Sequence, residues 1–206
     1  MNDFNLFHEQ SENEKFSFKD RFYRDKEFRN VVLTEQNLKD KEFYNCSFIS
    51  CNFFKLIFTS CEFEKCTFEV CDLSLITIVN SKFLDVTFKG SKAVGVDWQG
   101  TVKPSRYNFV DCKIDGCNFY KLNLQSVNMI KCSIKNADFT SAILTKGVFT
   151  SSDFLGSQFS GTDLSFADFS EAINYNINPV NNKFKKTIFS MPEVVSLLNG
   201  YDIIIK

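Results

Sequence analysis

Residues 41–90 read KEFYNCSFIS CNFFKLIFTS CEFEKCTFEV CDLSLITIVN SKFLDVTFKG. A large apolar residue returns at every fifth position of this stretch, beginning with Phe43, Phe48 and Phe53. A period of five matches neither the α-helix, whose period is 3.6 residues, nor the extended strand, whose period is two. It fits a chain that turns a corner every five residues and points one large side chain inward from each side.

The same spacing extends in both directions from this stretch. It reaches back to Phe18 and forward to Trp98, slips by one residue, and resumes from Phe109 to Phe169. The sequence therefore predicts a repetitive solenoid. Its expected parts are an N-terminal extension (1–17), a first solenoid segment (18–98), a loop or register break (99–108), a second solenoid segment (109–173) and a C-terminal element (174–206).

A second position, two residues before each large one, favours small side chains. All eight cysteines occupy it, namely Cys46, Cys51, Cys61, Cys66, Cys71, Cys112, Cys117 and Cys132. This spacing places the sulfurs on successive sides of the coil, whereas zinc sites usually need close pairs. We therefore expect buried, reduced thiols that fill the inside corners, with no metal and no cofactor.

The columns of like residues set the size of the coil. Positions twenty apart repeat the same side chain, as in Phe119, Phe139 and Phe159. Four sides of five residues then make one coil, and coils stack at the strand spacing of about 4.8 Å, so that one chain forms a rod of roughly 36 Å. In the first coil Lys26, Gln36 and Lys41 occupy the small inward position. Either that coil is distorted or these side chains reach out to water.

Several copies carry a recognisable five-residue pattern, such as Ala137-Asp138-Phe139 and Ala167-Asp168-Phe169. This pattern resembles the pentapeptide repeat family over residues 18–173. The resemblance implies an all-β fold, the right-handed quadrilateral β-helix. The period of the sequence argues for the four sides, and the resemblance adds the handedness.

The register break contains a proline and separates two large residues by eleven positions, so one residue is extra. Either a bulge or a looped-out repeat would accommodate it. Because binding residues concentrate on loops that rigid scaffolds hold, we interpret this stretch as a candidate partner-binding loop. A harmless insertion is the alternative. The candidate contacts are Gln99, Thr101, Val102, Lys103, Pro104, Ser105, Arg106 and Tyr107.

The C-terminal element has the signals of a short helix followed by a strand. Ser190 is the expected N-cap, Pro192 and Glu193 fit the first turn, and Gly200 ends the helix. Since the end of a solenoid exposes its core, this element predicts a cap. Its apolar excess further predicts a homodimer through the C-terminal ends, and a cap without dimerisation is the alternative. The expected interface residues are Met191, Val194, Val195, Leu197, Leu198, Tyr201, Ile203 and Ile205.

Two stretches of the sequence resemble one particular group within this family. The tail segments Ile177-Asn178-Pro179 and Phe189-Ser190-Met191-Pro192-Glu193-Val194, with Gly95-Val96-Asp97-Trp98 before the break, look like the quinolone-resistance pentapeptide proteins of Gram-positive bacteria. That resemblance implies a dimer that binds DNA gyrase and topoisomerase IV and protects them from quinolones. It also implies DNA mimicry by an acidic rod.

Charge gives mixed support to such mimicry, because the whole chain has a formal net charge of −1. The stretch 147–182 contains no Lys or Arg. We therefore interpret its acids as a candidate acidic surface near the dimer centre. These acids are Asp153, Asp163, Asp168 and Glu171.

Other classes of function lack their usual residues. The only histidine, His8, lies in the N-terminal extension, so no Ser-His-Asp or Cys-His arrangement is available in the solenoid. No catalytic residues are predicted, and we expect a binding protein that is not an enzyme. The polar, acidic start and the lack of a long apolar run predict a cytoplasmic protein without direct contact to membrane or nucleic acid. The alternative function is a scaffold for a different bacterial protein.

Overall fold

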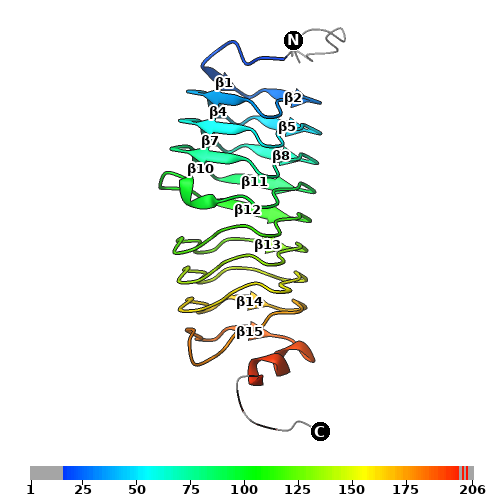
Figure 1. The fold of residues 1–206 in the computed structure, drawn as a ribbon, viewed down its shortest axis with the longest axis vertical. Helices are drawn as coiled ribbons and strands as arrows, with labels where there is room; N and C mark the ends of the chain where they lie inside the picture. The colour runs from blue at the N-terminus through cyan, green and yellow to red at the C-terminus, as the bar shows by residue number, and fades with distance from the viewer. Residues whose placement is uncertain (1–15, 200, 202, 204–206) are drawn as a thin grey trace.

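The computed structural model describes residues 16–199, 201 and 203. The chain forms a right-handed quadrilateral β-solenoid of about eight turns, as predicted. Figure 1 shows the coils stacked along one axis, with the first coil at one end and the helix η2 (Glu193–Leu198) at the other. Strands pair in parallel with the strand one coil later, so Phe43 lies opposite Phe63.

The solenoid has four faces, and three of them contain named strands. Face 1 carries β2 (Glu27–Arg29), β5 (Ser47–Ile49), β8 (Thr67–Glu69), β11 (Val86–Lys89), β12 (Tyr107–Val110) and β13 (Met129–Ile130), and β14 (Asp168–Phe169) and β15 (Ile188–Phe189) continue it. Face 3 carries β3 (Asn37–Lys39), β6 (Ile57–Thr59) and β9 (Thr77–Val79). Face 4 carries β1 (Phe22–Arg24), β4 (Glu42–Tyr44), β7 (Glu62–Glu64) and β10 (Lys82–Leu84).

Single parallel bridges continue the faces where the strands end. Face 2, between faces 1 and 3, consists of such bridges from Val32 through Asp72 and Lys113 to Ile173. On face 4 the bridges join Asn123, Ile143, Asp163 and Lys183. The short helix η1 (Trp98–Gly100) lies on face 3, just before the register changes between Thr101 and Tyr107.

Stacked aromatic rings form the core of the solenoid. The rings of Phe48 and Phe68 lie 4.6 Å apart and 9° from parallel. Phe139 stacks on Phe119 at 4.9 Å and on Phe159 at 5.2 Å. The predicted twenty-residue columns are confirmed, because one coil spacing brings identical rings into offset stacking contact.

The small inward residues hydrogen-bond to backbone groups that the corners bury. The Cys71 thiol donates to the Phe48 carbonyl at 3.3 Å and accepts from the Cys51 N–H at 3.4 Å. Ser91, one coil later, bonds in the same way to Phe68 and Cys71. All eight cysteines are free and buried, which confirms their predicted burial as thiols. A small side chain with a donor is therefore favoured at this position, because it also satisfies buried polar groups.

Where Asp or Asn precedes the central residue, its side chain can hold the corner of that side. The Asp138 carboxylate accepts the Thr140 N–H at 2.8 Å, and the Asn118 amide oxygen accepts the Tyr120 N–H at 3.0 Å. These two-residue bonds are Asx turns, which steer the chain into the bend. They give a structural reason for the acid in the repeat, independent of any partner.

The first coil is regular, and its lysines reach outward. β1 pairs with β4 in the same twenty-residue register as later coils. Lys26 is exposed, and the Lys41 amine donates to the Asp20 carbonyl at 2.6 Å. Of the two interpretations of the sequence, the structure therefore supports side chains that reach out to water and not a distorted coil.

Candidate functional site

The loop at the register break leaves the coil where the sequence places a lysine at the inward central position. Lys103 falls at the central position of face 4, one coil beyond Phe83, and Pro104 follows without an N–H donor. The Val102 N–H still bonds to the Ser81 carbonyl at 2.9 Å, and the Arg106 N–H bonds to the Phe83 carbonyl at 2.8 Å. Between these two bonds the chain projects outward, and Figure 1 shows this loop beside β10. Phe88 pairs with Phe109, which confirms the single extra residue.

Tyr107 is part of the core and not of the exposed loop. It lies in β12 opposite Val86, at a position that elsewhere holds a small residue, and it is 3% exposed. Its ring lies 4.7 Å from that of Trp98 and fills space that the outward loop leaves empty. Burial also raises the pKa of its phenol. The prediction of Tyr107 as a direct partner contact is therefore wrong for this conformation.

The remaining loop is held at both ends and exposed at its tip. The Arg106 guanidinium donates two bonds to the Asp85 carboxylate, at 2.8 and 2.9 Å. The Ser105 hydroxyl donates to the Val102 carbonyl at 2.6 Å, which closes the turn. Val102, Lys103 and Pro104 are exposed. A partner would meet these three side chains first.

Two further residues of the predicted loop support its start. The Gln99 amide donates to the Tyr120 carbonyl at 3.1 Å, and the Thr101 hydroxyl donates to the Trp98 carbonyl at 2.8 Å. Under the loop lies a groove of about 560 Å³ on face 4, reaching from Asp85 to the segment 122–128. The loop and this groove interrupt the regular stacking of coils on face 4.

The four predicted acids do not form one acidic surface. Asp168 lies on face 1, Asp153 on face 2 and Asp163 on face 4, while Glu171 lies at the corner after face 1. Asp163 also lies 3.9 Å from the Lys183 amine. The prediction was based on the closeness of these acids in the sequence, whereas the fold places them on different faces of the solenoid.

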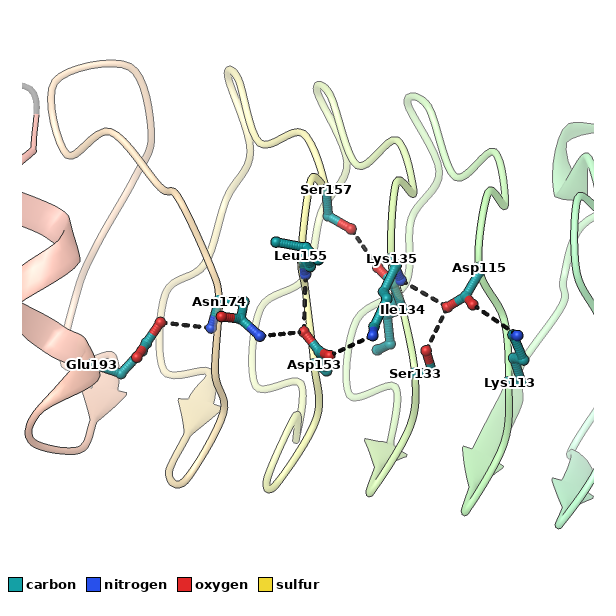
Figure 2. A network of polar contacts seen from close by, with 10 residues as sticks. All are labelled: Lys113, Asp115, Ser133, Ile134, Lys135, Asp153, Leu155, Ser157, Asn174 and Glu193. Atoms are coloured by element: carbon teal, nitrogen blue, oxygen red, sulfur yellow. Dashed lines mark hydrogen bonds and ion pairs between the residues drawn. The ribbon is translucent and has the colours of Figure 1, made fainter.

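Asp153 belongs to a polar network that joins several coils to the C-terminal element. Figure 2 shows the chain of contacts from Lys113 to Glu193 along face 2. The Asp153 carboxylate lies 3.0 Å from the Lys135 amine and accepts the Asn174 amide at 2.8 Å. Partial burial acts to raise its pKa, but the bonds from Asn174 and Lys135 outweigh burial and lower it. The Asn174 N–H in turn donates to Glu193 at 2.6 Å.

The C-terminal helix differs from the prediction in type and in cap. η2 is a 3-10 helix that starts at Glu193, and its N-cap, Pro192, supplies no side-chain bond. The Ser190 hydroxyl accepts the Glu171 N–H at 3.0 Å, so it serves the preceding coil instead of the helix. Ile203 lies in no strand, and Gly200 and Ile205 fall outside the described residues.

The helix covers part of the core end and leaves an apolar groove open. Leu197 packs against the core, and Val194 and Val195 are half-buried. Met191 is 75% exposed, and Leu198, Tyr201 and Ile203 are also exposed. A groove of about 580 Å³ lies at this end, lined mainly by Pro179, Phe184, Phe189, Leu198 and Tyr201.

Neither a metal centre nor a membrane span is found in the described part of the chain. Among residues 16–199, 201 and 203, no three His, Cys, Asp or Glu side chains are grouped so as to hold a metal ion. No helix within those residues is long and apolar enough to cross a bilayer.

Two family models match most of the solenoid. Residues 23–98 match a pentapeptide repeat region, and residues 108–145 and 147–173 match pentapeptide repeats. The chain belongs to the pentapeptide repeat family. The gap between the matches, 99–107, coincides with the loop of this pentapeptide repeat protein. A search of curated proteins with the sequence of the whole chain found no match.

Solved pentapeptide repeat structures share its architecture. One trypsin-treated variant of QnrB1, a plasmid-mediated fluoroquinolone resistance protein, is 18% identical with a TM-score of 0.52, over 90% of this chain and 97% of that chain. A second trypsin-treated QnrB1 variant is also 18% identical with a TM-score of 0.55, over 87% and 99% of the two chains. At this identity the likeness establishes a shared fold.

Proposed function

We propose that this chain is a cytoplasmic binding protein without catalytic activity that binds DNA gyrase or topoisomerase IV and protects it from quinolones or other poisons. QnrB1, a fluoroquinolone resistance protein, shares its fold over almost the full length of both chains. The tail residues 177–194 support the same proposal, because they resemble those of quinolone-resistance proteins.

The single observation that carries the proposal is the loop. A regular solenoid offers flat sides, and here one charged, exposed tip projects from face 4 on a rigid base. Such a tip is the kind of feature through which a scaffold contacts a partner. We assign the first contact to Val102, Lys103 and Pro104.

A homodimer through the C-terminal ends completes the proposal. The apolar groove at that end and the exposed Met191, Leu198, Tyr201 and Ile203 suit a second copy of the same surface. A two-fold dimer would present two loops, one on each side of its centre, to a partner that is itself two-fold.

DNA mimicry by an acidic strip receives little support from the charges. Asp153 and Asp163 are paired with Lys135 and Lys183, and the proposed acids point in different directions. We therefore favour a contact through the loop over replacement of DNA by a uniformly acidic rod. No direct binding of nucleic acid is included in the proposal.

The test is binding to purified gyrase and topoisomerase IV by surface plasmon resonance. The variant Val102→Ala, Lys103→Ala should bind about tenfold more weakly, a loss of about 1.4 kcal/mol. The matched control is Val70→Ala, Lys92→Ala, which changes one exposed Val and one exposed Lys away from the loop. Equal binding by wild type and loop variant would refute the assigned contact.

The alternative is a scaffold that binds a different bacterial protein through the same loop. It would be favoured if wild-type protein bound neither topoisomerase in this measurement. The loop geometry would then still mark the surface to be used in a search for the partner.

A further inference from the structure

The groove under the loop lies where the ladder of hydrogen bonds between coils is interrupted. On face 4 the N–H groups of Ile143, Asp163 and Lys183 each donate to the previous coil, at 2.9, 3.0 and 2.9 Å. The corresponding group one coil earlier is the N–H of Asn123. Within the part of the chain that the structure describes, this N–H has no acceptor.

Two carbonyl groups at the same edge also lack the donors that their equivalents have. The Ile143 carbonyl accepts the Leu124 N–H at 2.8 Å, and the Thr145 carbonyl accepts the Ser126 N–H at 2.9 Å. Their counterparts one coil earlier, the carbonyls of Asn123 and Gln125, accept no hydrogen bond from the described residues. Asn123 and Gln125 are exposed, so this edge faces the groove and solvent.

The loop satisfies only the opposite edge of the gap. The N–H groups of Val102 and Arg106 bond to the carbonyls of Ser81, which precedes β10, and of Phe83, which lies in β10. Between these two bonds the loop projects outward and leaves the edge at Asn123–Gln125 without a neighbouring strand. An unpaired parallel edge with free N–H and C=O groups is the surface on which an extended peptide can add as a strand.

The charges around the groove favour an acidic occupant. Asp85 is the acid in the groove lining, and Arg106 already pairs with it. Lys103 is exposed at the rim, and Lys121 and Lys146 are exposed at the two corners that bound face 4 near this edge. Asp138 lies on face 3, and Asp163, which lies on face 4 two coils beyond Asn123, is 3.9 Å from the Lys183 amine.

We infer that this groove receives an extended acidic segment of a partner protein, which adds as a strand to the edge Asn123–Gln125. Its backbone would pair with the free groups of that edge, and its acidic side chains would meet Lys103 and the flanking lysines. The inference deepens the proposed function, on which it rests for the loop as contact site, but its test requires no topoisomerase.

The test uses the full chain labelled for NMR and two synthetic peptides of about nine residues, one alternating Glu with Thr and one alternating Lys with Thr. We expect the Glu peptide to slow hydrogen exchange at the Asn123 amide and to bind about tenfold more tightly than the Lys peptide. Lys103→Glu should abolish that preference, while Lys92→Glu on face 2 should leave it unchanged.

A second variant separates backbone pairing from simple charge attraction. Asn123→Pro removes an N–H that has no partner in the free chain, together with the side-chain acceptor of the Gln125 N–H, so the melting temperature should fall less than in an Ile143→Pro variant while peptide binding is lost. Ile143→Pro is the matched control, because it removes an N–H bonded to Leu122 and should destabilise the solenoid. Unchanged exchange at Asn123 with the Glu peptide at millimolar concentration, or equal binding of both peptides, would overturn the inference whether or not gyrase binds.

Discussion

Asp153 shows how single residues in this solenoid serve the structure before any partner. Its carboxylate accepts the Leu155 N–H at 3.1 Å in an Asx turn, and it also pairs with Lys135 and Asn174 (Figure 2). The acid at this position is thus accounted for by the corner and by the network to Glu193. Acids of the repeat need not imply an acidic binding surface.

The lowered pKa of Asp153 predicts a pH-dependent contribution to stability. The contribution should be present above the unfolded pKa of about 3.9 and be lost as pH falls through the lower folded value. Asp153→Asn keeps an acceptor for Leu155 but loses the ion pair with Lys135. Urea unfolding should show wild type more stable by about 1 kcal/mol at neutral pH, with the difference vanishing near pH 2.

Lys135→Met is the control for that measurement, because it removes the other half of the pair. It should weaken the same pH dependence. A difference between wild type and Asp153→Asn that stayed constant from pH 7 to pH 2 would contradict the role assigned to the carboxylate.

At the residue scale the sequence predicts inward residues well and outward ones poorly. Phe139 and Cys71 follow from the period of five, because each inward position has one shape to fill. The partners of Asp153 could not be predicted in this way. Lys135 and Asn174 are about one coil away in the sequence, and outward positions vary too much to indicate pairs.

The loop is the element in which the sequence pattern and the structure differ most. The slip in register predicts an insertion, and the structure shows an outward loop with Lys103 at the position of a missing core residue. The compensating change lies in β12, where Tyr107 occupies a position for small residues. The sequence interpretation places Tyr107 in the loop, because this residue falls in the stretch between the central residues Trp98 and Phe109.

Replacing Tyr107 with the kind of small residue that the repeat favours at this position should therefore lower the stability of the fold. Tyr107→Cys conforms to the family pattern but leaves a cavity beside Trp98, and it should cost about 3 kcal/mol in the free energy of unfolding. Val127→Cys, at the same position one coil later, should cost no more than about 1.5 kcal/mol. Unchanged or higher stability of Tyr107→Cys in urea unfolding would show that Tyr107 does not fill that space.

The C-terminal element was predicted in position but not in detail. Its apolar residues indicate a cap, and Leu197 does pack on the core. The expected N-cap Ser190 instead bonds to Glu171 of the preceding coil. Local capping signals could not reveal this, because the competing donor belongs to a neighbouring coil nineteen residues earlier.

For the whole molecule, the proposed dimer would join two rods end to end. Leu198→Glu places a charge in the exposed apolar groove at the C-terminal end and should convert the dimer to a monomer in sedimentation equilibrium. Val70→Glu, at an exposed corner far from that end, should remain dimeric. A wild-type chain that sediments as a monomer, or a Leu198→Glu variant that remains a dimer, would rule out this interface.

Protection of a topoisomerase by this protein can be measured in a single titration. Gyrase and supercoiled DNA are mixed with a quinolone, and the cleaved DNA is measured as this protein is added. We expect cleavage to fall, with a midpoint near one dimer per gyrase, and the Val102→Ala, Lys103→Ala variant to shift that midpoint about tenfold higher. Constant cleavage up to a large excess of wild-type protein, with gyrase and with topoisomerase IV, would contradict the proposed protection.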